Sequence, residues 1–200
     1  MVCAFEWVDR DHLDRRSIEI FIARVYWKHF HADVSHFSDT LIGLRDTDGE
    51  WVASLGFSAL AMQHAYLERY LDLPVDRAIA SMRKKSDLSG VVSRWDLAEL
   101  GNLASLRPGF ARQMIVYMTQ FLHRRHFRWV VFTATTELRN SFRKVGYEPK
   151  CVAQADPLRL GTEAFRWGNY YEHRPQVMYG DVTKAFSQIE RINASHSVSI

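Results

Sequence analysis

Two places in the sequence hold residues whose types and spacing suit chemistry. Arg107-Pro108-Gly109 follows a run of small residues and precedes a helical pattern. The first N–H groups of a helix can bind an anion there, and glycine lets a phosphate approach the backbone. Glu99 lies in an otherwise apolar stretch, where a buried carboxylate is costly and therefore marks a candidate functional group. The sequence thus predicts an anion site and a titratable carboxylate.

Glu99 and Asn102 each have a structural alternative to a chemical role. Glu99 either acts chemically, or faces solvent or pairs with an arginine such as Arg94. Asn102 either orients a substrate or holds a bulge, and Gly101 beside it favours the bulge, because glycine inside a strand often marks one.

Charge is unevenly distributed along the chain. The net charge is +3, but residues 107–150 contain nine Lys or Arg and two acidic residues, Glu137 and Glu148. A basic block of this kind favours an anionic partner, which could be phosphate, nucleic acid, an acidic carrier protein or a membrane surface. Solvated helix faces are the alternative for single arginines. No nucleic-acid-binding motif is present, so nucleic acid is not expected as a partner.

Composition limits the class of protein. The 200 residues are 47% hydrophobic, without a run of 18 uncharged apolar residues or an apolar leader, which predicts a cytoplasmic protein. Cys3 and Cys151 are expected to be free thiols. No metal is expected, because His29, His31 and His36 lack partners at ligand spacing.

The elements that must position these residues alternate between helical and strand patterns, with a strand–helix–strand unit in the middle. This order predicts an α/β (α+β) fold with a mixed, mostly antiparallel sheet, a central parallel strand pair and helices on both faces. One domain over 1–200 is expected, with a core over about 15–183 and a tail over 184–200. The expected elements are a helix capped by Ser17, two strands around the turn 46–49, two short helices within 64–84, strand structure within 90–105, a helix over 110–126, a strand over 128–135, a helix over 137–145 ended by Gly146, strands and loops over 150–182, and a short final helix with a frayed tail.

The middle of the chain resembles the GCN5-related N-acyltransferase (GNAT) superfamily. In that fold a strand, a glycine-bearing loop and a helix receive the pyrophosphate of an acyl-pantetheine donor. The next strand splays away, and a helix ending in Gly-Phe or Gly-Tyr follows. The matching pieces are Asp96 to Ser105, Arg107 to Ala111, Trp129 to Thr135, and Leu138 to Tyr147.

Longer motifs resemble the thermostable hemolysin family over roughly residues 15–183. These motifs are "YLERYLD", "ELGNLAS", "FTATTELRNSFRKVGYEP", "AQADPLRLG" and "WGNYYEHRPQVMYG". The family is similar in layout to acyl-homoserine-lactone synthases and N-acyl amino acid synthases, which join a fatty acyl thioester to an amine. The resemblance implies a splayed central strand pair and an N-acyltransferase.

The implied donor is a fatty acyl thioester, with a long chain, of coenzyme A or of an acyl carrier protein, and the implied acceptor is a small amine such as an amino acid derivative. Amide formation needs a base, for which Glu99 is the leading candidate, with Asn102 as a second catalytic residue. Backbone N–H groups near Gly101 to Ala104 would bind the thioester carbonyl. The residues expected to bind the donor are Gly101, Leu103, Ala104, Arg107, Gly109, Ala111, Arg112, Arg139, Asn140 and Arg143.

Two departures from the superfamily pattern affect this interpretation. Leu106 stands where the loop usually begins with Gln or Arg, so Arg107 is expected to serve from one residue further on. Phe142 stands where a helix often supplies a tyrosine acid, which argues against a tyrosine acid mechanism.

The acyl or acceptor pocket is expected to include Glu68, Thr135, Trp167, Tyr170 and Tyr171. Aromatic residues at this density more often form core, and threonine is more often a strand former. The competing function is a membrane-acting protein without acyl transfer, which would need an export route and a lipid-facing apolar surface. Membrane association is therefore expected to be weak or absent.

Overall fold

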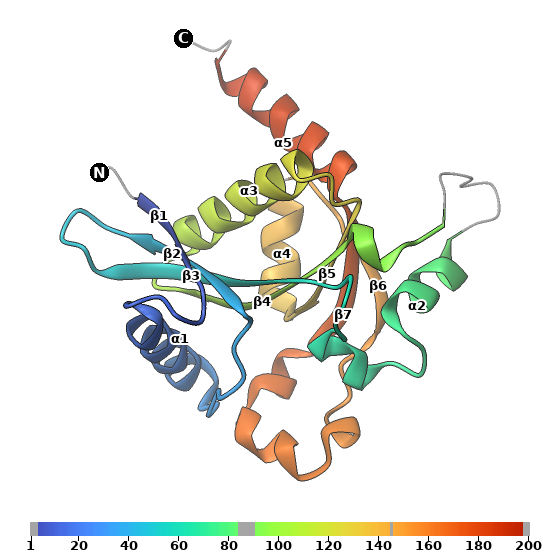
Figure 1. The fold of residues 1–200 in the computed structure, drawn as a ribbon, viewed down its shortest axis with the longest axis horizontal. Coiled ribbons are helices and arrows are strands. Elements are labelled where there is room, and N and C mark those ends of the chain that lie inside the picture. The colour runs from blue at the N-terminus through green and yellow to red at the C-terminus, as the bar shows by residue number, and fades with distance from the viewer. Residues whose placement is uncertain (1–3, 84–90, 145, 198–200) are drawn as a thin grey trace. The chain divides into compact units, whose positions relative to one another are not determined.

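Strand pairing organises the computed structural model, which describes residues 4–83, 91–144 and 146–197 (Figure 1). The strand order in the sheet is β1-β2-β3-β4-β5-β7-β6. β1 pairs with β2, β2 with β3, β5 with β7 and β6 with β7, each time antiparallel. The mixed, mostly antiparallel sheet is as predicted. The strands are β1 (Ala4–Val8), β2 (Thr40–Arg45), β3 (Trp51–Ala59), β4 (Leu97–Ser105), β5 (Trp129–Ala134), β6 (Lys150–Gln154) and β7 (Gln176–Asp181).

The predicted central parallel pair consists of β4 and β5. The Arg128 N–H, just before β5, donates to the Asp96 carbonyl, just before β4, at 2.9 Å, so both strands start side by side. They are connected through helix α3 (Pro108–Arg124), as a parallel crossover requires. The predicted parting of the two strands further along stays a prediction.

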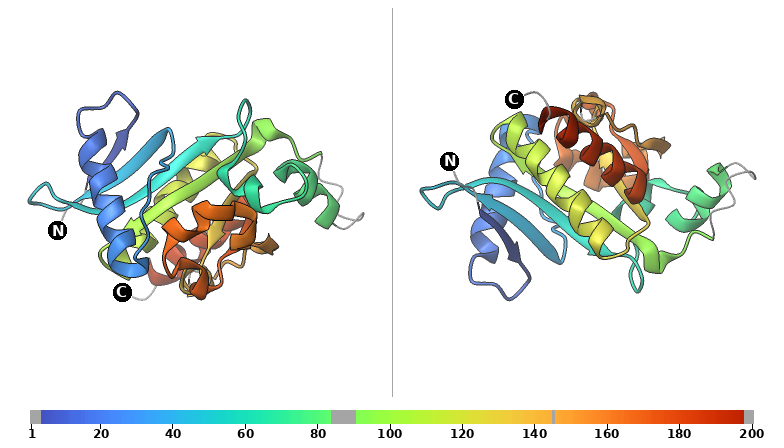
Figure 2. Two further views of the ribbon diagram at one scale, coloured as in Figure 1. Left: turned by 90° about the horizontal axis from the view of Figure 1, so that it is seen from below. Right: turned by 90° about the horizontal axis from the view of Figure 1, so that it is seen from above.

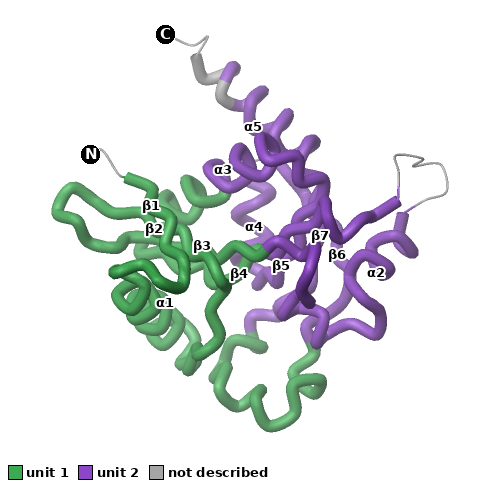
Figure 3. Tube along the Cα trace, in the orientation of Figure 1, with its two compact units in different colours: residues 1–58, 100–115, 156–172 green, residues 59–99, 116–155, 173–200 purple. Residues whose placement is uncertain are grey.

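The chain divides into two compact units, drawn in different colours in Figure 3. Unit 1 comprises residues 1–58, 100–115 and 156–172, and unit 2 comprises 59–99, 116–155 and 173–200. The expectation of a single domain stays a prediction. The remaining helices are α1 (Arg15–Phe30), η1 (Tyr66–Tyr70), α2 (Val75–Met82), η2 (Arg94–Asp96), α4 (Thr136–Lys144), η3 (Pro157–Trp167), η4 (Tyr170–His173) and α5 (Val182–Ser197), where η denotes a 3₁₀-helix.

In unit 1, α1 covers one face of β1, β2 and β3 (Figure 1). Its Ile18, Ile22 and Val25 are buried in a cluster that also contains Leu41 and Trp51. Burying each aliphatic side chain of this kind stabilises the fold by about 1.5–3 kcal/mol. The helix is therefore held by one apolar stripe, and its opposite face is left to solvent.

The β2–β3 hairpin forms around the predicted turn at residues 46–49. The Asp46 carboxylate accepts the N–H groups of Asp48 and Glu50, both at 3.0 Å. Gly49 has a φ of 83°, which glycine adopts without strain. This prediction is confirmed because all of its determinants are local.

In unit 2, β7 lies between β5 and β6, and α5 lies beside the C-terminal half of α3 (Figure 2). The rings of His123 and Phe186 stack there with centroids 4.0 Å apart. None of the helices in the described part of the chain combines the length and apolar content that a membrane span requires.

Four element predictions need correction. β1 was not predicted, although it pairs with β2 along its whole length. The first helix begins at Arg15, and Ser17 is not its cap, because the Ser17 hydroxyl donates to the Asp14 carbonyl. Residues 157–173 form helical turns in place of the expected strands, and α5 is a 16-residue helix where a short one was expected.

Candidate functional site

Glu99 lies in β4 and reaches the first turn of η1. Its two carboxylate oxygens accept one backbone N–H each, from Tyr66 at 2.8 Å and from Leu67 at 3.0 Å. The first N–H groups of a helix have no partner inside the helix, so a carboxylate at this end satisfies them. The two bonds fix the position and orientation of the carboxylate.

The electrostatic environment of Glu99 favours its neutral form. Burial raises its pKa to about 7, and the negative charge of Glu68 adds to this, while the N–H groups of Leu67 and Tyr66 act in the opposite direction. The predicted alternative of a pair with Arg94 is not observed, because the Arg94 guanidinium contacts Glu68 and Asp76. Glu99 can therefore gain and lose a proton near neutral pH.

Glu68 is held by several donors at once. Its carboxylate accepts the N–H groups of Ala65 at 3.0 Å and Val75 at 2.8 Å, and forms an ion pair with Arg94 at 2.6 Å. Burial opposes ionisation of Glu68, but the bonds from Arg94 and Val75 outweigh it and lower its pKa. Glu68 is thus a fixed anion that closes the N-terminus of η1, the 3₁₀-turn that binds Glu99.

Glu68 and Glu99 differ in the direction of their pKa shifts. One carboxyl has its pKa raised and the other has its pKa lowered, within one group of contacts, and such divergence is typical of catalytic centres. Sequence reasoning singled out both residues but missed Arg94 as the partner of Glu68 and the η1 backbone as the partner of Glu99. Nothing local in the sequence could reveal bonds across 26 to 33 residues.

β4 contains the bulge predicted at Gly101-Asn102. The Leu60 N–H donates to the Leu97 carbonyl, and the Leu106 N–H donates to the Val52 carbonyl. Between these two bonds β4 advances by nine residues, from 97 to 106, while β3 advances by eight, from 52 to 60. Asn102 has a φ of 47°, in the left-handed region that asparagine tolerates better than most residues. One extra residue on one strand is the definition of a β-bulge.

The Asn102 side chain is bound to the loop before β2. Its Oδ1 accepts the Ser38 N–H at 3.0 Å and the Ser38 hydroxyl at 3.3 Å, and its Nδ2 donates to the His36 carbonyl at 3.0 Å. Gly56 lies against the same place, and a Cβ there would come within 2.8 Å of the Asn102 Oδ1. These contacts give the side chain a structural role, and its predicted catalytic role stays a prediction.

The loop predicted to hold the donor's phosphates is exposed. The Arg107 carbonyl accepts the N–H groups of Phe110 at 3.1 Å and Ala111 at 3.4 Å, which begins α3. Arg107, Gly109 and Arg112 are all exposed. A Cβ added to Gly109 would meet no atom within 4 Å, so space is open at this helix start. The position suits an anion, and the binding role stays a prediction.

The other predicted donor-binding residues lie in and around α4. The Arg139 guanidinium donates to the Ala134 and Arg174 carbonyls, both at 2.8 Å, and so ties the end of β5 to the chain before β7. Asn140 and Arg143 are exposed and contact each other at 3.4 Å. Thr135 is buried, and its hydroxyl accepts the Leu138 N–H at 3.4 Å as a helix cap.

The predicted substrate-binding aromatic residues form a cluster with α1 in unit 1. Ring centroids of Trp167 and Tyr170 are 5.1 Å apart, and those of Phe30 and Tyr170 are 5.2 Å apart. Tyr171 packs edge-on to Tyr170 at 5.5 Å. Tyr26 joins the cluster, and burial raises its pKa to about 12. Mutual ring contacts of this kind are typical of core packing.

The position that often supplies a tyrosine acid holds Phe142, whose ring packs against Phe132 at a centroid distance of 5.0 Å. The nearby Tyr147 hydroxyl donates to the Asp181 carbonyl at 3.3 Å, and burial raises its pKa. Its proton is therefore held firmly, which disfavours Tyr147 as a substitute acid.

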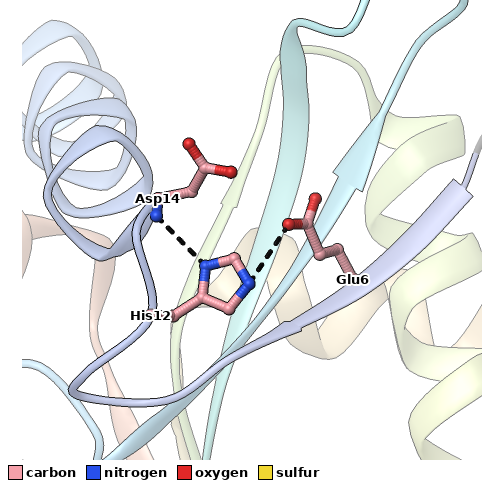
Figure 4. Close-up of side chains that lie close together, drawn as sticks. All are labelled: Glu6, His12 and Asp14. Carbon is pink, nitrogen blue, oxygen red and sulfur yellow. Dashed lines mark hydrogen bonds and ion pairs between the residues drawn. The ribbon is translucent and has the colours of Figure 1, made fainter.

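A second group of titratable side chains, which the sequence did not indicate, lies in unit 1 (Figure 4). Glu6, His12 and Asp14 bring one ligand-type atom each within 4.8 Å of one another. The Asp14 N–H donates to the His12 Nδ1 at 3.1 Å, so the neutral ring carries its proton on Nε2, which faces the Glu6 Oε1 at 3.5 Å. Neither ring nitrogen of His12 then has a lone pair directed at a metal.

Arg45 supplies the positive charge in this group. It forms ion pairs with Glu6 at 2.7 Å and Asp14 at 2.9 Å, and its guanidinium lies over the Trp51 ring at 3.4 Å. A metal ion would have to displace it. The arrangement therefore fits a structural ion-pair network better than a metal site.

Comparison with solved structures identifies the fold. FeeM, an N-acyl amino acid synthase from uncultured soil microbes, has a TM-score of 0.62 at 11% identity and covers 94% of each chain. BjaI, a CoA-dependent acyl-homoserine lactone synthase solved with SAM and isopentyl-CoA, has a TM-score of 0.58 at 12% identity, over 96% of this chain and 90% of BjaI. A GCN5-related N-acetyltransferase from Kribbella flavida has a TM-score of 0.50 at 13% identity, over 89% of this chain and 98% of the other. The chain has a GNAT-like fold.

Sequence comparison identifies the family. The chain belongs to the thermostable hemolysin family, because the sequence model of that family matches residues 8–186. The resemblance inferred from the sequence motifs is thereby confirmed. A comparison with curated proteins finds none that matches this chain.

Proposed function

We propose that this protein is an N-acyltransferase that moves a fatty acyl group from a coenzyme A or acyl-carrier-protein thioester to the amine of a small molecule. The observation that carries the proposal is the environment of Glu99, a carboxyl with a pKa raised to about 7 and fixed by two backbone N–H groups. A general base works best when its pKa lies near the operating pH. The GNAT-like fold supports the same reaction class.

In the proposed reaction the acceptor amine loses a proton to the Glu99 carboxylate, directly or through one water. The amine nitrogen then forms a bond to the thioester carbonyl carbon, and the carbon–sulfur bond breaks. After the attack the nitrogen releases one further proton, and the leaving thiolate takes up this proton, so the products are an amide and a free thiol. Burial assists the base, because the neutral carboxyl formed by proton uptake is the form favoured at this position.

The start of α3 is the proposed place for the donor's phosphates. Arg107 and Arg112 would supply positive charge, and the open space at Gly109 would let a phosphate approach the backbone at Ala111. The backbone of Gly101, Leu103 and Ala104 would bind the pantetheine arm and the carbonyl. Arg139, Asn140 and Arg143 of unit 2 are also proposed as donor-binding residues.

The donor class remains part of the proposal. BjaI is described as CoA-dependent. Residues 107–150 hold nine basic residues against two acidic ones, and this block would attract both the phosphates of coenzyme A and the acidic surface of a carrier protein. The residues proposed to contact the acyl chain or the acceptor are Glu68, Thr135, Trp167, Tyr170 and Tyr171.

The test is release of free thiol by the purified protein. Acyl-CoA and acyl-carrier-protein donors of increasing chain length are combined with a panel of amino acids and simple amines, and the product is identified by mass spectrometry. We expect thiol release that requires both a long-chain donor and one class of amine. Absence of amine-dependent thiol release with every donor would contradict the proposal.

A further inference from the structure

The outward face of α1 exposes a line of large apolar side chains. Leu13 is 99% exposed, Ile20 41% and Trp27 58%. Ile20 and Trp27 are seven positions apart in α1, which places them on one side of the helix, and Leu13 lies in the turn that precedes the helix. Within α1, Ile20 and Trp27 are about 10 Å apart along the axis at the rise of an α-helix. The core of unit 1 does not use this face, because Ile18, Ile22 and Val25 occupy the opposite one.

Basic side chains border this apolar line. Arg16, Arg24 and Lys28 are all exposed and lie on the same half of the helix as Ile20 and Trp27. Single exposed apolar residues are common on protein surfaces and need no explanation. An apolar line bordered by cations is more specific.

Acidic side chains are missing from this half of α1. Glu19 is the one acidic residue within 16–31, and it pairs with Arg15 at 2.6 Å on the buried side. Asp33, just beyond the helix, pairs with Arg166 at 2.8 Å. The half of α1 around Ile20 and Trp27 therefore carries net positive charge, while Asp11 and Asp14 lie beside Leu13 and Asp14 pairs with Arg45 at 2.9 Å.

We propose that this face of α1 docks on an anionic lipid surface. An interfacial helix combines apolar and aromatic side chains that enter the headgroup region with Lys and Arg that contact anionic headgroups. Indole rings in particular favour the membrane–water interface. An acidic protein partner would account for the cations but not for the exposed line of Leu13, Ile20 and Trp27.

A neighbouring segment of unit 1 adds to the apolar character of this surface. Figure 2 shows α1 beside the segment 156–172, and the Asn169 N–H donates to the Phe30 carbonyl at 2.9 Å. Leu158 and Phe165 of that segment are 84% and 86% exposed. The proposal does not rest on acyl transfer, because no residue on this face belongs to the proposed catalytic or donor site.

The test is co-sedimentation of the full chain with vesicles of phosphatidylcholine, with and without phosphatidylserine. We expect binding to the mixed vesicles and little binding to phosphatidylcholine alone. Arg24→Glu should weaken binding by roughly tenfold, because one basic residue near an anionic surface accounts for about a fivefold change and charge reversal adds repulsion. Trp27→Ser should also weaken binding by roughly tenfold, because it removes an indole ring that favours the membrane–water interface. Higher salt should weaken binding further.

Matched variants control for charge and exposure. Lys184→Glu changes the net charge as Arg24→Glu does, from an exposed position in α5, and Met62→Ser removes an 86% exposed apolar side chain in unit 2. Both should bind vesicles like the unchanged protein.

Equal losses in these controls, absence of binding to mixed vesicles, or binding to an acidic carrier protein in place of vesicles would each overturn the proposal. Thiol release from a long-chain acyl donor and the accepted amine, measured without vesicles, should be unchanged in Arg24→Glu, which separates this test from that of the proposed function.

Discussion

Glu99 in unit 2 and Glu6 in unit 1 are both partly buried strand carboxylates beside other titratable groups, but they receive different partners. Glu6 contacts the Arg45 guanidinium at 2.7 Å. Within the described part of the chain, the Glu99 carboxylate accepts hydrogen bonds from the backbone N–H groups of Tyr66 and Leu67, while the nearby cation, Arg94, is bound by Glu68 and Asp76. The two N–H groups orient the Glu99 carboxylate, and burial raises its pKa to about 7, which leaves its proton exchangeable near neutral pH. The two groups thus differ in where the cation lies: Arg45 pairs with Glu6 itself, whereas Arg94 pairs with the neighbours of Glu99.

The largest effect is expected on catalysis. Glu99→Gln should lower the rate of thiol release by about 10²- to 10⁴-fold, the range associated with loss of a general base. Glu6→Gln, which changes a carboxylate of the other group, should leave the rate close to that of the unchanged protein. Equal losses in both variants, measured at matched folded fractions, would remove Glu99 from the proposed mechanism.

The cations of the two groups should differ in their contribution to stability. Arg94→Met should lower the free energy of unfolding by about 3 kcal/mol, because it leaves Glu68, with a side chain only 11% exposed, without its cation. Arg45→Met should cost only about 1 kcal/mol, because Glu6 is 30% exposed and better solvated. Urea unfolding of both variants measures the difference, and a larger cost for Arg45→Met would reverse the comparison.

The pH dependence of stability should report the proton on Glu99. Its pKa rises from an ordinary value of 4.5 to about 7 on folding, so the folded state binds this proton more tightly than the unfolded state. The unchanged protein should therefore lose stability relative to Glu99→Gln as the pH rises from about 4.5 to about 7, by about 1–3 kcal/mol. Thermal unfolding of both proteins across this range is the measurement. A difference that is constant with pH would show that Glu99 titrates normally.

The smallest effect is expected from metal ions at the unit 1 group. Because the Asp14 N–H occupies the His12 Nδ1 and Arg45 occupies the carboxylates, zinc should not change the melting temperature of the unchanged protein. A zinc-dependent rise that disappears in His12→Ala would show that the ion displaces Arg45.

Local sequence information was sufficient where the determinants lie close together in the chain. The Asp46–Gly49 turn, the bulge at Gly101-Asn102 and the left-handed Gly146 that follows α4 were all predicted from a few neighbouring residues. The parallel crossover of β4 and β5 was predicted from the order of the elements, because such a connection needs an intervening helix.

Features built from distant segments could not be predicted in this way. β1 was missed because its short mixed sequence becomes a strand only through pairing with β2. The helical turns after Pro157 were missed because Gly161 and Gly168, both at positive φ, interrupt the helical pattern. At Gly168 the carbonyl of Phe30 lies within 2.2 Å of where a Cβ would be, a tertiary contact that leaves no periodic signal.

The extra residue in β4 has a consequence for how this strand can change. Side chains alternate between the two faces of a strand, and one inserted residue shifts that alternation by one step. In the half of β4 that carries Glu99 and the half that leads to Arg107, the inward and outward alternation of side chains is therefore offset by one residue relative to β3. Deleting Asn102 would restore regular pairing only by turning one half over, so that either the glutamate or the residues before the arginine loop would exchange interior for exterior.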